Sequence, residues 1–144
     1  MVIGGEWLLF DDGVLRPIIR GEILCADGSC VEVYFLVDTG ADRTVFNAST
    51  LLKINLPHLK PENKIGGVGG LTNSVIVETQ IQLLRENGRQ VVFRGKYAAV
   101  TELEALDFCV LGRDILEHFA VIVDFPENFI GLVGQNHIYK IEAK

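Results

Sequence analysis

The sequence lacks any cluster of basic side chains and any long hydrophobic run. Its net charge of −6 argues against nucleic acid or an anionic membrane surface as a partner. No apolar stretch reaches the roughly 18 residues that a membrane helix needs. The first residues also lack the basic start and apolar core of a signal peptide. We therefore expect a soluble, cytoplasmic protein that binds neither nucleic acid nor membrane.

Cysteine is scarce as well. Cys25, Cys30 and Cys109 form an odd set without metal-ligand spacing, and no histidine lies in a cluster of cysteines or carboxylates, so we predict no metal site. Cys25 and Cys30 flank a predicted turn, where a cross-strand disulfide is geometrically conceivable. In a reducing cytosol, free thiols are the preferred interpretation.

The chain also lacks internal repeats, linkers and low-complexity tracts. It has 144 residues, of which 49% are hydrophobic and 22% are charged. That length suits one domain with a proper core. We therefore expect residues 1–144 to form a single domain.

Strand-like runs bounded by turn residues fill most of the chain. Hairpins are predicted where Asp-Asp-Gly, Asp-Gly and Glu-Asn-Gly occur, ending at Gly13, Gly28 and Gly88. Residues 112–119 indicate a short helix, and residues 47–53 suit one helical turn. Strands are expected at 7–10, 14–25, 31–37, 74–84, 90–100, 108–111, 120–125, 129–133 and 137–141. The pattern predicts an all-β fold, a closed antiparallel barrel with one short C-terminal helix.

The most unusual stretch is the end of the apolar run at residues 31–37. It stops abruptly at Asp38, Thr39 and Gly40, and apolar residues follow soon after. Both flanks are apolar, so we expect the Asp38 carboxylate to lie at the end of a buried strand with little water nearby. A carboxylate in such a place needs partners or altered ionisation. Asp38 is therefore a candidate reactive group; the alternative is a plain turn that closes a hairpin.

A second unusual stretch, residues 64–71, holds four glycines around Val68. Glycine loses much backbone entropy on ordering, so this run suits a mobile hairpin tip better than a strand interior. Its spacing fits neither phosphate-binding glycine pattern, and no helix pattern follows it. A phosphate loop, and with it a nucleotide cofactor, is therefore not predicted.

These stretches resemble a known family. Asp-Thr-Gly-Ala-Asp at 38–42, the glycine-rich run at 64–71 and Val-Leu-Gly-Arg-Asp-Ile-Leu at 110–116 occur in the order found in retropepsins. The second stretch is similar to the retropepsin flap and the third to the strand-to-helix motif of these aspartic proteases. The resemblance covers roughly residues 14–125 and implies the retropepsin type of barrel.

The sequence departs from retropepsins at both ends. Retropepsin termini are short and interleave into a dimer sheet, whereas residues 1–13 and 125–144 extend past the usual limits. That part of the dimer interface is therefore in question here. The extensions look more like those of cellular or bacterial retropepsin-like enzymes.

A reaction of this type needs two carboxylates around one water, and the chain holds a single Asp-Thr-Gly. The resemblance therefore implies a homodimer in which two Asp38 residues meet on a twofold axis and share one proton. One would act as general base toward water, and the other would polarise the scissile carbonyl. The implied catalytic residues are Asp38, Thr39 and Gly40, with no cofactor.

By the same resemblance, the flap closes over a peptide or protein substrate bound as an added strand. The implied substrate-binding residues are Ala41, Asp42, Val45, Ile65, Gly66, Gly67, Val68, Gly69 and Val110. Most of these are apolar or glycine, so hydrophobic residues are expected on either side of the cut bond. For Val45 and Val110, a plain core role is the alternative.

Two arginines acquire structural roles from the resemblance. Arg113 is expected to pair with Asp42 at the base of the site, through a charge-assisted hydrogen bond. Arg16 is expected to reach the partner's Asp42 and so to form a dimer contact. The alternative for Arg16 is a solvated surface charge.

The sequence thus predicts an aspartic endopeptidase. Two other classes compete with it. One is a catalytically weak peptide-binding or dimerisation module on the same scaffold, and the other is an unrelated β-barrel whose motifs coincide by chance. The intact Asp-Thr-Gly and the flap favour the enzyme, because a pure binder has no use for a pair of desolvated carboxylates.

Overall fold

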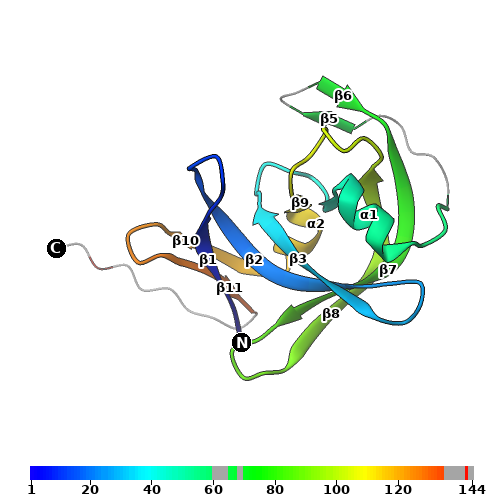
Figure 1. Ribbon diagram of the computed structural model, residues 1–144. Helices are drawn as coiled ribbons and strands as arrows, with labels where there is room; N and C mark the ends of the chain where they lie inside the picture. Colours follow the sequence, from blue (N-terminus) through cyan, green and yellow to red (C-terminus); the bar gives the residue numbers. More distant parts are fainter. Residues whose placement is uncertain (60–64, 68–69, 135–141, 143–144) are drawn as a thin grey trace.

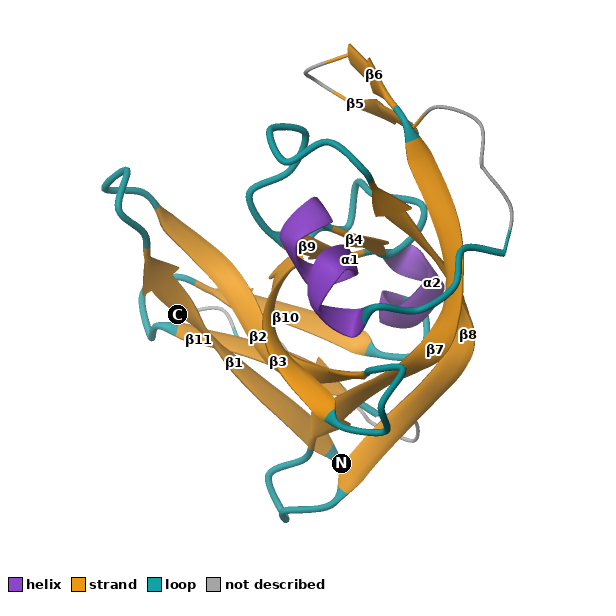
Figure 2. Ribbon diagram, turned by 45° about the vertical axis from the view of Figure 1, so that its right-hand side comes forward, coloured by secondary structure: helices purple, strands orange, loops and turns teal. Residues whose placement is uncertain are grey.

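A computed structural model describes residues 1–59, 65–67, 70–134 and 142, and these form strands with two short helices (Figures 1 and 2). The strands are β1 (Val2–Leu9), β2 (Leu15–Leu24), β3 (Cys30–Val37), β4 (Val45–Phe46), β5 (Ile65–Gly67), β6 (Gly70–Thr72), β7 (Ser74–Leu84), β8 (Gln90–Val100), β9 (Cys109–Leu111), β10 (Ala120–Asp124) and β11 (Phe129–Val133). The helices are α1 (Ala48–Ile54) and α2 (Arg113–Leu116).

Six of the strands close into a barrel in the order β2-β3-β9-β4-β8-β7, and β7 pairs back onto β2. The predicted closed barrel is thereby confirmed. Two pairings, β3 with β9 and β4 with β8, are parallel, although an antiparallel barrel was expected. Parallel neighbours cannot be joined by a tight turn, and here long stretches of chain separate them. Local turn patterns therefore gave no sign of these two pairings.

The hairpin turns follow the sequence prediction closely. Gly13, Gly28 and Gly88 have φ angles of 79°, 87° and 82°, in the left-handed region that glycine adopts without a steric penalty. Each lies in the turn between paired antiparallel strands, β1 with β2, β2 with β3, and β7 with β8. The local chemistry of these turns therefore fixes which neighbouring strands meet.

Helix α1 is longer than the single turn predicted for residues 47–53. Asn47 caps it, because its Oδ1 accepts a hydrogen bond of 3.1 Å from the Thr50 N–H. Helix α2 is shorter than the predicted segment 112–119. No helix among the described residues is long and apolar enough to cross a membrane. The predicted strand 137–141 lies outside the described residues.

Aliphatic and aromatic side chains fill the barrel interior. Along β3, Val33, Phe35 and Val37 are buried, while Glu32 just before Val33 and Tyr34 just after it are exposed. The largest side chains with almost no exposed surface are Ile3, Ile18, Ile19, Ile23, Phe35, Phe46, Ile54, Ile81, Leu83, Leu111, Ile130 and Leu132. Strand β3 therefore delivers its last residues from a rigid core to the surface.

The terminal strands form a side sheet in the order β10-β11-β1, which continues into the barrel through β2. Residues 2–5 of β1 pair with β11, and residues 6–9 pair with β2. Ile18 of β2 lies opposite Glu6 on one side and Leu36 of β3 on the other. The side sheet thus branches from the barrel beside the end of β3, two residues before Asp38. Strands β1 and β11 pair within one chain.

The barrel closes at Gly21, which is paired with both Val33 and Leu83. A Cβ atom there would lie 2.9 Å from both Leu83 Cδ2 and Phe35 Cε2, and 3.1 Å from the Gln82 carbonyl oxygen. Any side chain at this position would force the barrel wall to shift.

We therefore predict that Gly21→Ala lowers the free energy of unfolding by about 1–3 kcal/mol, the usual cost of overpacking. The matched control is Gly95→Ala in β8, where the nearest atom to a new Cβ is 3.5 Å away. Urea unfolding curves of the two variants provide the comparison. Equal stabilities would contradict the close approach at Gly21.

Candidate active site

Asp38 directly follows β3, and hydrogen bonds on both sides fix its position. Its N–H donates to the Leu111 carbonyl oxygen at 3.1 Å, which extends the parallel pairing with β9 by one residue. Its Oδ1 accepts from the Gly40 N–H at 2.9 Å, and the Ala41 N–H donates back to the Asp38 carbonyl oxygen at 3.2 Å. The carboxylate therefore caps the turn that it begins.

Asp38 is half-buried, and Thr39 and Gly40 are exposed. The sequence predicted a carboxylate with little water nearby, which is wrong for the single chain. Strand β3 is buried on its inner face, but its end opens onto the surface because the turn at 38–41 leaves the barrel. A Cβ on Gly40 would lie 3.2 Å from Asp38 Oδ1, so glycine lets the backbone lie close to the carboxylate.

Arg113, at the start of α2, binds this turn through its side chain and its backbone N–H. One guanidinium nitrogen makes an ion pair with Asp42, and another donates to the Thr39 carbonyl oxygen at 3.2 Å. The Arg113 backbone N–H donates to the Ala41 carbonyl oxygen at 2.9 Å. The structure thus joins Arg113 and Asp42 as predicted. Because the Asp42 side chain is 86% exposed, the ion pair itself contributes little, about 0–1 kcal/mol.

A buried threonine makes the second connection between the turn and α2. Thr44 Oγ1 donates to Asp114 Oδ1 at 2.7 Å and accepts from the Gly112 N–H at 3.1 Å. The Thr44 N–H donates to the same Asp114 oxygen at 2.9 Å. Sequence reasoning missed Thr44 and gave Asp114 no role. The signal was a polar residue beginning the apolar pair Val45-Phe46, but its partner lies 70 residues away.

Gly112 makes this connection possible. A Cβ there would lie 2.3 Å from the Arg43 carbonyl carbon and 2.4 Å from its oxygen. No side chain fits, so the backbone before α2 packs directly on the backbone of the Asp38 loop. The glycine of the Val-Leu-Gly-Arg-Asp motif is therefore required by contact distance.

Val45 and Val110 lie opposite each other, where β4 pairs with β9. They are only 6% and 8% exposed, and Val45 packs with Ala98 and Val100 in a small cluster apart from the main core. The structure therefore gives both valines a core position. Ala41 is half-buried beside Asp38. Contact of these three residues with a substrate stays a prediction.

The glycine-rich run forms a hairpin, as the sequence predicted. In β5 and β6, Ile65 pairs with Thr72, Gly66 with Leu71, and Gly67 with Gly70. Figures 1 and 2 show this hairpin standing apart from the barrel, beyond the start of β7. Lys64, Val68 and Gly69 lie outside the described residues, so the tip of the predicted flap is not described.

Arg16 is held within its own chain. Its guanidinium donates to the two carboxylate oxygens of Asp12 at 3.0 and 2.6 Å, and lies 5.4 and 5.0 Å from the ring centres of Phe10 and Phe108. The hydrogen bond from Arg16, with that from the Val14 N–H, lowers the pKa of Asp12 to about 2. Arg16 is thus fixed between the β1–β2 turn and the start of β9. Its contact with a partner stays a prediction.

The cysteines are free thiols, as the sequence favoured. Cys30 lies opposite Leu24 in the β2–β3 ladder, so Cys25, one residue further on, projects from the other face. Cys109 is buried and its Sγ donates to Thr50 Oγ1 at 3.3 Å. Within the described ranges, no three His, Cys, Asp or Glu side chains lie close enough together to hold a metal ion.

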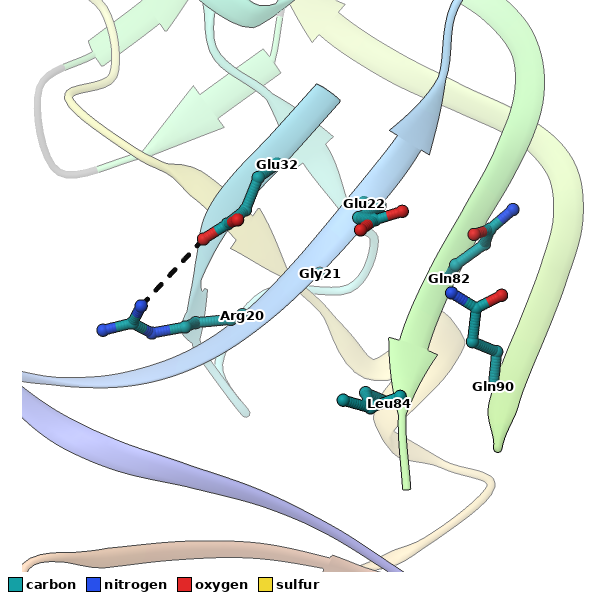
Figure 3. A pocket seen from close by; sticks show the side chains of 7 residues that line it. All are labelled: Arg20, Gly21, Glu22, Glu32, Gln82, Leu84 and Gln90. Carbon is teal, nitrogen blue, oxygen red and sulfur yellow. Dashed lines mark ion pairs between the residues drawn. The ribbon is translucent and has the colours of Figure 1, made fainter. Parts of the chain in front are cut away.

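A surface hollow of about 300 Å³ lies elsewhere, between β2 and β3 on one side and β7 and β8 on the other (Figure 3). Its lining residues are Arg20, Gly21, Glu22, Glu32, Gln82, Leu84 and Gln90. Arg20 is shared between Glu6 at 2.9 Å and Glu32 at 4.0 Å. None of the predicted site residues lines this hollow, so we place the candidate site at the Asp38 turn.

Comparison with known proteins bears on this site. Residues 11–124 match the family model described as retroviral aspartyl protease. Among solved structures, a retropepsin-like aspartic protease from Rickettsia conorii is 19% identical, with a TM-score of 0.56, and the match covers 92% of this chain and 88% of that one. The barrel is therefore of the retropepsin type. No curated protein sequence matches this chain significantly.

Two further structures are more distant in shape. The EIAV protease complexed with the inhibitor HBY-793 is 25% identical, with a TM-score of 0.49, and covers 71% of this chain and 86% of its own. The retroviral protease-like domain of Ddi1 from Leishmania major is 16% identical, with a TM-score of 0.47, and covers 85% and 98% respectively.

The position of Thr44 leads to a prediction about the loop. Thr44→Val keeps the shape of the side chain but leaves the buried Gly112 N–H without its acceptor, which costs about 1–3 kcal/mol of unfolding free energy. Thr44→Ser keeps the hydroxyl and loses one methyl group, so the cost falls to about 1 kcal/mol. Chemical denaturation of both variants tests this order. If the serine variant is the less stable of the two, the hydroxyl is not what joins the loop to α2.

Proposed function

The chain belongs to the retroviral aspartyl protease family, and on that basis we propose that it is an aspartic endopeptidase that works as a homodimer. One observation carries the proposal. The single Asp-Thr-Gly lies where a buried strand reaches the surface, and β9 and α2 fix the backbone around it through Leu111, Arg113 and Thr44. Such fixed geometry is what an acid–base pair requires.

The second carboxylate comes from a second copy. Each chain supplies one Asp38, and a twofold axis through the Asp38 turn brings the two side by side. Two carboxylates about 3 Å apart cannot both ionise, so they hold one proton between them. The exposed Thr39 and Gly40 of the single chain support this arrangement, because a partner at the turn would cover them and exclude the water that now reaches Asp38.

The reaction is hydrolysis without a covalent intermediate. The ionised Asp38 accepts a proton from water as the water oxygen attacks the peptide carbonyl carbon. The protonated Asp38 of the other subunit donates a hydrogen bond to the carbonyl oxygen and stabilises the negative charge that develops on it. The C–N bond then breaks, the amine leaves with a proton, and a carboxylic acid remains.

The substrate is an extended peptide. The β5–β6 hairpin would close over it as a flap, through the glycine-rich backbone of Gly66, Gly67 and Gly69, with Ile65 and Val68 supplying apolar contacts. Backbone hydrogen bonds to an added strand give affinity, and side-chain pockets near Ala41, Asp42, Val45 and Val110 give a preference for hydrophobic residues.

Arg16 and Asp42 would form a contact across the dimer. The Asp42 side chain stays largely exposed although it pairs with Arg113. The Arg16 guanidinium has five N–H donors, and its described bonds to Asp12 occupy two of them. It therefore keeps the capacity to bind the partner's Asp42.

The first prediction from the proposed function concerns Asp38. Asp38→Asn removes both the base and the shared proton, so the rate of peptide cleavage falls at least about hundredfold, the smaller end of what a general acid–base group contributes. Asp27→Asn, in the turn at the far end of β3, is the matched control and retains full activity. Mass spectrometry of a peptide library digested at pH 4–7 provides the readout. Folded wild-type dimer that cleaves nothing would identify the chain as a binding module instead.

A second prediction concerns concentration. Because each chain supplies half of the catalytic pair, activity per milligram falls as the protein is diluted through its dissociation constant. A dilution series, with the same samples measured by sedimentation velocity, tests this. Activity per milligram that stays constant in samples shown to be monomeric would mean that one chain cleaves alone.

A further inference from the structure

The Arg16 side chain, near the beginning of β2, is enclosed by three other side chains. Its two terminal guanidinium nitrogens donate to the two carboxylate oxygens of Asp12, at 3.0 and 2.6 Å. The rings of Phe10 and Phe108 lie beside each other, with 4.4 Å between their centres, and the guanidinium carbon lies 5.4 and 5.0 Å from those centres. Only 23% of the Arg16 side chain is exposed as a result. One carboxylate and two rings therefore hold this arginine in place.

Asp12 is itself fixed within the β1–β2 turn. Its Oδ1 also accepts a hydrogen bond of 3.0 Å from the Val14 N–H. The backbone of the turn is closed by a bond of 3.1 Å from the Phe10 N–H to the Val14 carbonyl oxygen. The hydrogen bonds from Arg16 and from the Val14 N–H lower the pKa of Asp12 to about 2. The carboxylate therefore stays charged in mildly acidic solution, where a pair of carboxylates such as the proposed Asp38 pair can share a proton.

A second arginine on β2 is held much more loosely. Arg20 donates to Glu6 at 2.9 Å, and its other terminal nitrogen lies 4.0 Å from Glu32. The Arg20 side chain is 54% exposed, against 23% for Arg16. It lines the surface hollow of Figure 3, which none of the predicted site residues reaches. The enclosure of Arg16 is therefore a property of its position and not of every arginine on this strand.

The enclosed arginine lies beside the proposed half-site. In the β2–β3 ladder, Ile18 lies opposite Leu36, and continuing the same register by two residues sets Arg16 opposite Asp38. Phe108 directly precedes β9, and the far end of β9 accepts the Asp38 N–H. Figures 1 and 2 show the β1–β2 turn pointing toward the same end of the molecule as β5 and β6. A second chain that meets the Asp38 turn therefore also comes near Arg16.

Fixing Arg16 in advance favours the contact proposed with the second chain. An arginine side chain loses rotamer entropy when an interface orders it, and a side chain that is already ordered loses less. The described bonds to Asp12 occupy two of its five N–H donors, so the guanidinium can still bind another carboxylate. The Asp42 side chain is 86% exposed and is therefore accessible to a partner. The enclosure thus lowers the entropic cost of the contact without blocking it.

We propose that Asp12 is a positioning residue for the dimer: it holds Arg16 against the two rings, in the conformation from which the guanidinium binds the partner's Asp42. This role rests on the proposed function, because that function requires a second copy of the Asp38 turn. Asp12 acts through Arg16 and does not itself touch the substrate or the second chain. The β1–β2 turn thereby takes part in dimer assembly.

The test compares the two carboxylates that pair with arginines of β2. Asp12→Asn removes the charge but keeps an oxygen that can accept the Val14 N–H, so the turn is retained. The matched control, Glu6→Gln, removes the charge that pairs with Arg20. We expect Asp12→Asn to raise the dimer dissociation constant at least about tenfold, within the range for coupled residues of one hydrogen-bond network, and Glu6→Gln to leave it unchanged. Sedimentation velocity gives the dissociation constants, and urea unfolding curves confirm that both variants fold.

A double-mutant cycle tests whether Asp12 acts through the contact across the dimer. Asp42→Asn removes the proposed acceptor of the partner and also weakens the pair with Arg113 inside each chain. The second effect is the same with and without Asp12, so the cycle cancels it. If Asp12 acts only through Arg16, adding Asp12→Asn to Asp42→Asn changes the dissociation constant by no more than about twofold. Effects that multiply in full would overturn the proposal, because Asp12 would then support the fold and not this contact.

The remaining outcomes separate the positioning role from the proposed function. An Asp12→Asn variant that dimerises like Glu6→Gln overturns the positioning role. So does one that dimerises more tightly than wild type, because Asp12 would then compete with the partner for Arg16. If Asp12→Asn weakens the dimer as expected but Asp38→Asn cleaves peptides like wild type, the positioning role stands and the proposed function fails. A wild-type chain that remains monomeric at all concentrations would overturn both.

Discussion

The Asp38 turn keeps its shape because a second segment of the chain satisfies its backbone. The end of β9 accepts the Asp38 N–H, Arg113 donates to two carbonyl oxygens of the turn, and Thr44 accepts the Gly112 N–H. A surface turn without such partners would sample many conformations, at a cost in backbone entropy of about 1–2 kcal/mol for each residue that must be ordered. The direct contact between the backbones at Arg43 and Gly112 leaves little room for these alternative conformations of the turn.

The barrel serves mainly to bring these two segments together. Strand β3 is the second strand of a hairpin and ends at the site. Strand β9 pairs parallel to it, and the chain between them forms β4, α1, the glycine-rich hairpin, β7 and β8. The short strand β4 then fits between β8 and β9, parallel to one and antiparallel to the other. The carboxyl ends of the parallel strands β3 and β9 therefore lie at the same edge of the sheet. Active sites of α/β proteins also lie at the carboxyl ends of parallel strands.

The sequence predicted what local chemistry decides. Glycines at 13, 28 and 88 mark turns because the turn itself demands a positive φ, and alternation along β3 and β7 follows from a sheet with one buried face. It missed the two parallel pairings, which join residues about 50 to 75 positions apart, and the Thr44–Asp114 contact, which joins residues 70 positions apart. The pairing of Asp42 with Arg113 is equally long-range, and it was found through the resemblance of two motifs, not through spacing.

The pairing of β1 with β11 has a consequence for how subunits associate and dissociate. Residues 2–5 of β1 and 130–133 of β11 form an antiparallel pair within one chain. The edges that face each other in this pair are therefore not open to a strand from another molecule. Subunits whose terminal strands interleave must break those strand pairings before they can dissociate. In this chain, residues 2–5 and 130–133 pair with each other, so association and dissociation of two subunits do not require these strands to exchange partners.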